Sequence, residues 1–441
     1  MKRIGKMLVI FFILTGVLAL AADVVTIKYA NWNLGTPEEN NVERQMIQAF
    51  MDTHPNIKVV IDDSIKGDWN ASLAAAAAAG TMPDVFMLTT VPDALANGWL
   101  YDLTKTVATD PDWSKIPSNI TSTIKYNGKV SAIPFAMHFM GYFMNKDIFT
   151  SENIAPLKFN YTTTQFKNAV LRLTKHSKGI VGLSEEIQVF EWYPASVSFK
   201  FGFYTFDGKK FNLDSQEFID GFNLAKSFVK AGAVYSALTD EQKTAIAGSP
   251  SADGWATGHI ALNYNGTWMV PDYKKNLSFA WDFVGIPGGR TILVLDYLGI
   301  SKSTKHIKEA YEFAKWMSFS KQGYLKRLEL AKKSNTILTT PPLMNDAELV
   351  DKYQANVDVP GLKEAYRNIG RAIVEGFKFV PGYAQARWNA PTGIKIGDKT
   401  NASIGDVLWN GTKMDLKIED IAKQLNDLAN QKYQEALKAI K

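Results

Sequence analysis

The sequence predicts an α/β protein made of two lobes, and three observations lead to this prediction. Its 441 residues are about three times the ~150 that one domain usually takes. Strands alternate with helices in the N-terminal part of the chain, which is typical of a parallel sheet flanked by helices. No Gly-, Pro- or Ser-rich linker divides the chain, so we expect it to cross between the lobes more than once.

Residues 1–21 have the pattern of a secretory signal peptide. Three basic residues, Lys2, Arg3 and Lys6, precede an apolar run from Met7 to Leu18. Ala19-Leu20-Ala21 then fits a small-x-small cleavage site. An uncleaved anchor helix is the alternative, but the run is shorter than the ~20 apolar residues of a membrane span. We expect a soluble protein of the periplasm, because no cysteine is present to carry a lipid anchor.

The first strand, the first helix and the second strand follow from local signals. Val24 to Ala30 alternates apolar and polar residues, which predicts a strand. Thr36-Pro37-Glu38-Glu39 has the form of a capping box with Pro at the first helical position, so we expect a helix from there past Phe50. His54-Pro55-Asn56 predicts a turn, and the alternation from Ile57 to Ile61 predicts another strand.

A second helix and a buried strand complete this N-terminal unit. Asp68 is suited to cap a helix that runs to Ala79, and Gly80 is suited to end it. Pro83-Asp84 leads into the apolar run Val85–Leu88, which suits a buried parallel strand. The resulting β-α-β-α-β order predicts a parallel sheet.

Three later elements have clear signals. Asn127-Gly128-Lys129 predicts a turn between two short strands, the second of which ends at Ile133-Pro134. Apolar residues at helical spacing predict helices over 307–317 and 418–440.

Charge, cysteine content and motifs exclude several function classes. Lys plus Arg number 49 and Asp plus Glu 44, with no long basic run, which argues against nucleic acid as a partner. Without cysteine there is no disulfide, thiolate metal site or cysteine nucleophile. The five histidines are isolated, and the sequence has no G-x-S-x-G, P-loop or G-x-G-x-x-G motif. We therefore expect neither enzymatic activity, nor a metal, nor a cofactor.

The aromatic content is high, with 11 Trp, 17 Tyr and 25 Phe. Four tryptophans stand in polar, loop-like settings: Trp32, Trp192, Trp268 and Trp388. Sugars need a flat apolar surface for their C–H faces and polar groups for their hydroxyls, and such settings supply both. The alternative for each of these tryptophans is packing in a core or between the lobes.

Four stretches, in order along the chain, resemble the maltose-binding-protein-like family of extracellular solute-binding proteins. They are the helix-to-strand passage Gln48–Val59, the stretch Ala78–Phe86 with its Pro83-Asp84, Asn127-Gly128-Lys129 followed by Asn145-Lys146-Asp147, and Asn265-Gly266-Thr267-Trp268 followed by Gly285-Ile286-Pro287. The family consists of binding subunits of ABC sugar transporters. The resemblance implies a sugar or oligosaccharide ligand, permease subunits as partners and a monomeric protein.

The resemblance also implies a periplasmic-binding-protein-like fold, in which a multi-strand hinge joins two α/β lobes around a ligand cleft. Residues 22–137 and 287–320 would form the N-terminal lobe, and residues 138–286 and 321–441 the C-terminal lobe. The crossings are expected at Pro134–Met140, at Ile286–Gly289 and after the helix that contains Trp316.

The resemblance and the residue settings together give a set of candidate ligand contacts. Trp32 and Asn33 follow the first strand, Trp69 begins the alanine-rich helix, and Thr89 and Thr90 end the strand after Pro83-Asp84. The other candidates come from the crossings and the second lobe: His138, Trp192, Trp268, Asp296, Arg387 and Trp388.

Two alternative functions stay open at this point. An exported polysaccharide-degrading enzyme would use the same aromatic residues together with a pair of carboxylates. A binder of a non-sugar or acidic solute, such as a polyol phosphate, a uronate or a peptide, could use Arg290, Arg387 and His138 to hold an anionic group.

Overall fold

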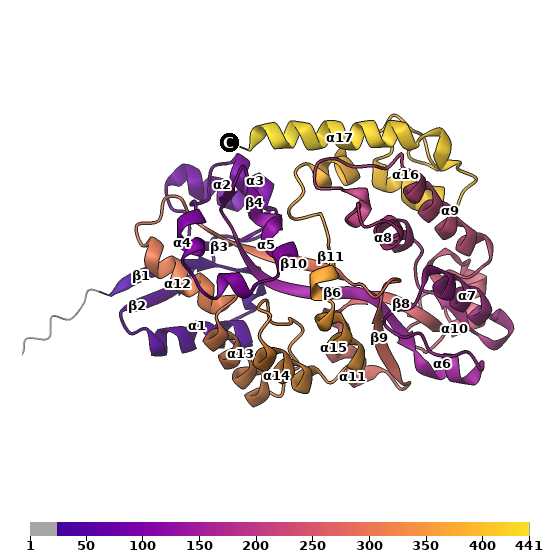
Figure 1. Ribbon diagram of the computed structural model, residues 1–441, viewed down its shortest axis with the longest axis horizontal. Coiled ribbons are helices and arrows are strands. Elements are labelled where there is room, and N and C mark those ends of the chain that lie inside the picture. The colour runs from indigo at the N-terminus through magenta and orange to yellow at the C-terminus, as the bar shows by residue number, and fades with distance from the viewer. Residues whose placement is uncertain (1–23, 441) are drawn as a thin grey trace, which may run out of the picture.

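The computed structural model describes residues 24–440, so the predicted signal peptide lies outside the described residues. Two α/β lobes lie beside each other along the long axis of the molecule, and long strands run between them (Figure 1). The predicted two-lobe, periplasmic-binding-protein-like fold is confirmed. Within residues 24–440, none of the helices combines the length and the apolar character that a membrane crossing requires.

The N-terminal lobe is built on the predicted parallel strands. β1 (Val25–Ala30) pairs in parallel with both β2 (Ile57–Ile61) and β3 (Val85–Leu88). α2 (Trp69–Ala79) begins and ends as expected, because Asp68 accepts a hydrogen bond from the Ala71 N–H and Gly80 has a φ of 69°. The smaller elements of this lobe are α3 (Val91–Ala96), α4 (Thr104–Ala108), α5 (Ser118–Thr121), β4 (Lys125–Tyr126) and β5 (Lys129–Val130).

The first helix starts later than the capping box predicts. Thr36 and Glu39 do form the reciprocal hydrogen bonds of such a box, but these bonds close a turn. Asn40 then takes a positive φ of 39°, which interrupts any helix. α1 (Val42–Thr53) begins after it, capped by the Asn41 side chain on the Arg44 N–H.

Two antiparallel strands connect the lobes. β6 (Ile133–Asn145) pairs with β10 (Ile292–Ile300) from Ile133↔Leu298 to Met140↔Ile292. β10 also pairs with β3, and the far half of β6 pairs with strands of the second lobe, so one sheet extends through both lobes. The first crossing was expected at Pro134–Met140, a segment that lies within β6. The second runs along β10, because residues 286–290 form a turn closed by the Ile286 N–H and the Arg290 carbonyl.

The C-terminal lobe packs helices around its half of the sheet. Its strands are β7 (Val181–Leu183), β8 (Ile260–Gly266) and β9 (Trp281–Gly285). Its helices up to the second crossing are α6 (Lys146–Ser151), α7 (Thr163–Leu173), α8 (Ile187–Val197), α9 (Gln216–Lys230), α10 (Asp240–Ala247) and α11 (Val270–Asn276). α7, α8 and α9 enclose a core rich in aromatic rings, with Phe166 and Phe222 fully buried.

The predicted lobe boundary at residue 320 differs from the structure. α13 (Lys321–Lys333) follows α12 (Ile307–Met317) and stays with the N-terminal lobe, packed on α1 and α12. Arg327 of α13 is ion-paired with Glu43 of α1. At Gly323 a Cβ would lie 2.1 Å from the Trp316 carbonyl oxygen, so only glycine permits this close approach.

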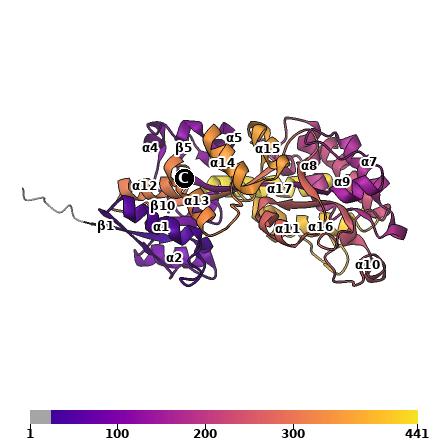
Figure 2. The same cartoon turned by 90° about the horizontal axis from the view of Figure 1, so that it is seen from below.

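The chain crosses to the C-terminal lobe after α13. α14 (Ala347–Val357) packs on α13, and α15 (Pro360–Arg367) packs on β9 of the C-terminal lobe. Seen from below, these two helices lie between the lobes (Figure 2). β11 (Ile373–Val374) then pairs with the start of β10.

The last helices complete the C-terminal lobe and reach back to the first. α16 (Ile404–Gly411) and α17 (Ala422–Ala439) pack on it, the latter through Leu425 and Ala429. α17 also contacts α3 of the N-terminal lobe, so it spans both lobes along the top of Figure 1.

Candidate ligand-binding cleft

The connecting strands β6 and β10 present one sealed face and one open face. The sealed face carries buried side chains: Met137, Phe139, Leu293 and Leu295. The residues that alternate with them are half-buried: Ala136, His138, Met140, Val294 and Asp296. Because His138 pairs with Val294 and Ala136 with Asp296, these side chains share one face of the ribbon. This face forms the floor of a site between the lobes.

A cavity of 750 Å³ adjoins this floor and has walls from both lobes. Asn33 and Asn41 line it from the N-terminal lobe, and Trp268 and Pro271 line it from the C-terminal lobe. Much of the remaining lining is uncharged and polar, from the start of α1 and the segments after α12 and α13: Asn40, Gln45, Ser318, Ser334, Thr336, Thr339 and Thr340. The volume lies within the range of ~300–1,000 Å³ that small-molecule sites usually have.

Trp268 contacts neighbours on β6 and β8 while the residue remains 40% exposed. It stands just after β8, and a Cβ on Gly266 would lie 2.3 Å from its ring, so glycine is needed for the ring to fold back over the strand. The imidazole of His138 meets the indole edge-on, with 5.3 Å between the ring centroids. His138 Nδ1 lies 3.2 Å from the Thr267 hydroxyl. Burial lowers the pKa of His138, which keeps the imidazole neutral at pH 7.

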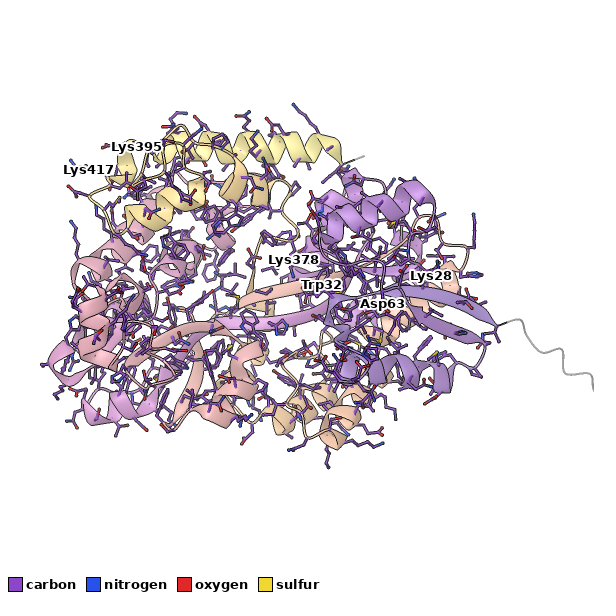
Figure 3. The ribbon with its side chains drawn as sticks, turned by 180° about the vertical axis from the view of Figure 1, so that it is seen from behind. Lys28, Trp32, Asp63, Lys378, Lys395 and Lys417 are labelled. Carbon is purple, nitrogen blue, oxygen red and sulfur yellow. The ribbon has the colours of Figure 1, made fainter. Side chains whose placement is uncertain are left out.

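Trp32 and Trp69 form a second aromatic group, on the N-terminal lobe. Their rings meet edge-on with centroids 5.0 Å apart, and Trp69 donates its indole N–H to the Met87 carbonyl at 2.8 Å. Trp32 is 39% exposed and lies where the two lobes meet (Figure 3). Thr89 donates to the Asn70 side chain next to this group. The carboxyl ends of β1 and β3 thus hold an aromatic pair, and neither Trp32 nor Trp69 lines the cavity.

The predicted contact Thr90 has a different function. Its side chain accepts a hydrogen bond from the Asp93 N–H and caps α3, and the residue is buried. Its hydroxyl is therefore committed to the helix.

The prediction that Trp192 binds ligand is wrong. Trp192 lies inside α8, is fully buried against Phe166 and donates its indole N–H to the Tyr142 hydroxyl at 3.1 Å. Its polar neighbours in the sequence suggested a loop, whereas the helix turns its ring into the core. No ring face is open to a solute.

Arg387 is also not free for a ligand. It is buried, ion-paired with Glu191 and bonded to the Tyr383 hydroxyl at 2.7 Å. Its guanidinium stacks 4.4 Å from the ring of Trp388, which is 46% exposed. Neither Arg387 nor Trp388 lines the cavity. This prediction is corrected because the guanidinium completes a buried network of the C-terminal lobe.

The structure thus brings Asn33, His138, Trp268 and Asp296 together at one cavity. Asn41 and the loop at residues 336–341 also line the cavity, and neither was predicted. The position of Asn41 has a sequence signal, because asparagine directly before a helix is a common capping residue. Lys378 forms an ion pair with Asp296, and no local pattern marks it. Among residues 24–440, no group of three or more His, Cys, Asp or Glu side chains could hold a metal ion.

A two-lobe α/β fold with a polar, tryptophan-lined cavity at its hinge is the architecture of solute-binding proteins. Comparison with family models gives the same result, since residues 36–324 match the bacterial extracellular solute-binding protein family. The chain belongs to this family, and the resemblance noted in the sequence is confirmed.

Individual relatives are distant in sequence and similar in fold. An uncharacterised ABC transporter extracellular-binding protein of Pyrococcus horikoshii is 25% identical over 335 residues, which are 72% of this chain and 73% of that protein. The ABC substrate-binding protein of Listeria monocytogenes in complex with cycloalternan has a TM-score of 0.67 and 19% identity, covering 93% of this chain and 99% of that one. A cyclic α-maltosyl-1,6-maltose binding protein of Arthrobacter globiformis has a TM-score of 0.67 and 16% identity, with the same coverage.

Proposed function

We propose that this chain is the substrate-binding subunit of an ABC importer and that its cleft binds a mono- or oligosaccharide in the periplasm. The observation that carries the proposal is the partly exposed Trp268 in a cavity lined by many uncharged polar groups. Such a ring can stack on the C–H face of a sugar, while amide and hydroxyl side chains exchange hydrogen bonds with its hydroxyls. The relatives solved with cycloalternan and named for cyclic maltosyl-maltose are consistent with such a ligand.

The two walls suggest how binding changes the conformation. Asn33 belongs to the N-terminal lobe and Trp268 to the C-terminal lobe. A ligand that contacts both stabilises the closed arrangement, because its second set of contacts exists only when the lobes approach. Moving such an equilibrium from 1:99 to 99:1 takes about 5.5 kcal/mol of differential binding. The permease subunits would then recognise the closed form of the monomer and accept the ligand unchanged.

Isothermal titration calorimetry with a panel of neutral oligosaccharides tests the proposal. Trp268→Ala should weaken binding by more than ~1.5 kcal/mol, or about tenfold, as expected when an aromatic platform is lost. Trp409→Ala is the matched control, because Trp409 on α16 is 45% exposed and lies outside the cavity. Equal affinities in the two variants would remove Trp268 from the site. Conversion of an oligosaccharide into shorter products would overturn the binding function itself.

A further inference from the structure

We propose that the cleft selects uncharged sugars, and that Asp296, which lines the cavity, sets this selectivity by neutralising its ion-pair partner Lys378. The inference rests on the proposed sugar-binding function and specifies its substrate class. It separates neutral oligosaccharides from uronates and sugar phosphates.

Lys378 is held in place from three directions. Its ammonium forms an ion pair with Asp296, whose side chain is only 13% exposed. Its carbonyl accepts a hydrogen bond from the Val91 N–H at 2.8 Å, at the start of α3. The next carbonyl, that of Phe379, accepts from the Tyr126 hydroxyl. Figure 3 shows Lys378 where the lobes meet, whereas Lys395 and Lys417 lie far away on the C-terminal lobe.

The charged side chains that line the cavity carry more negative than positive charge. Its lining contains three carboxylates, Glu39, Glu43 and Asp296, and one guanidinium, Arg327. Arg327 is ion-paired with Glu43 and donates to the Met317 carbonyl at 2.8 Å. Even with Lys378 counted, the site carries more negative than positive groups. An anionic ligand would lose its hydration here without gaining an unpaired cation, which is unfavourable.

The cations that an acidic ligand could have used are committed elsewhere. Arg290 donates to the carbonyls of Ala195 and Arg371, and it lines no part of this cavity. Arg387 is paired with Glu191, and His138 is neutral because it is buried. Each residue named for the acidic-solute alternative is therefore either remote or uncharged. The hydroxyls of a neutral sugar, in contrast, match the amide and hydroxyl groups of the lining.

The variant Asp296→Asn should shift the specificity of the cleft from neutral toward acidic sugars. Asp296→Asn keeps the shape of the side chain and removes its charge, which leaves the Lys378 ammonium without its carboxylate. A carboxylate or phosphate on the ligand can then pair with it. The ratio of affinity for acidic to neutral sugars should rise at least about tenfold. Adding Lys378→Met to Asp296→Asn should abolish this gain, because the cation is gone.

The test compares binding of chemically paired probes by thermal shift and calorimetry. The neutral probes are α- and β-1,4-linked oligomers of glucose, xylose and galactose, and the acidic probes are oligogalacturonates, glucuronate-bearing xylo-oligosaccharides and sorbitol 6-phosphate. Asp110→Asn is the matched control, since Asp110 pairs with Lys315 at 2.7 Å away from the cavity. The wild type and this control should bind a neutral probe at least tenfold more tightly than its acidic partner.

The outcomes separate the two proposals. Equal or tighter binding of an acidic probe by the wild type would overturn the neutral selectivity and leave sugar binding intact. An unchanged ratio in the Asp296→Asn variant would remove Asp296 and Lys378 as its determinants. Binding of no probe of either kind would contradict the proposed function, and the selectivity with it. The wild-type comparison decides the selectivity even if Asp296→Asn does not fold.

Discussion

The imidazole of His138 lies edge-on to the indole of Trp268, at an interplanar angle of 72° and with 5.3 Å between the ring centroids. His138 belongs to the connecting strand β6, and Trp268 follows β8 of the C-terminal lobe. The contact therefore couples the hinge directly to the aromatic wall of the cleft.

A double-mutant cycle measures this coupling. Edge-to-face aromatic pairs contribute about 0.5–1.5 kcal/mol beyond the area they bury, so His138→Ala should weaken sugar binding by releasing the indole. In a Trp268→Ala background the same change should have little further effect, because the ring it orients is absent. Calorimetry on the four proteins gives the coupling energy. Strictly additive losses would show that the two rings act independently.

Gly266→Ala should impair binding without replacing any ligand contact. The new methyl group would lie 2.3 Å from the Trp268 ring, so the indole must move. Displacing a binding group by even an ångström is costly, and we expect a loss of at least tenfold in affinity. Gly370→Ala is the control, since nothing lies within 4 Å of a Cβ there. Retained affinity, with an unshifted tryptophan fluorescence spectrum, would contradict the constraint.

Arg387→Met should reduce stability and leave ligand affinity unchanged. Removing one partner of a buried ion pair typically costs about 3–5 kcal/mol, because the other charge, here that of Glu191, stays buried. Urea unfolding measures the loss of stability, and calorimetry measures the affinity at a temperature where the variant is folded. A lower affinity in the folded variant would return Arg387 to the binding site.

Glu375 should make the stability depend on pH. It follows β11, donates its N–H to the Leu293 carbonyl at 2.8 Å, and burial raises its pKa from 4.5 to about 7. Between these values the folded protein binds a proton that the unfolded chain has released, so the contribution of Glu375 is fully present below pH 4.5 and is lost as the pH rises through 7.

The variant Glu375→Gln isolates this effect. It stays uncharged at every pH, so its stability relative to the wild type should increase from about pH 4.5 to about pH 7 and then remain constant. Urea unfolding at intervals of pH provides the difference curve. A flat curve over this range would mean that Glu375 is solvated like an ordinary surface carboxylate.

Much of the fold could be predicted because its signals are local. Asp68 and Gly80 bound α2 through their own backbone and side-chain chemistry, and both were identified correctly. The start of α1 was missed for an equally local reason, since the positive φ of Asn40 breaks the helix that the capping box suggested.

The site was only partly predictable, because burial depends on residues distant in the sequence. Trp192 stands in a polar sequence but donates to Tyr142 across the core, and Arg387 pairs with Glu191, 196 residues away. Lys378 reaches Asp296 in the same way. Trp268 and His138, both marked by local pattern, line the cavity. Only the folded chain shows which charges are already paired.

The pairing of β6 with β10, interrupted by one register shift between Asp296 and Tyr297, also limits how the molecule can bend. A ribbon of two strands, bonded from Ile133 to Met140, resists being stretched or sheared and yields chiefly by twisting. The ribbon therefore resists changes in the angle between the lobes. The main-chain hydrogen bonds between β6 and β10 set the resting value of that angle. Substitutions on the outer surface should leave that angle unchanged, while a second proline in β6, beyond Pro134, should alter it.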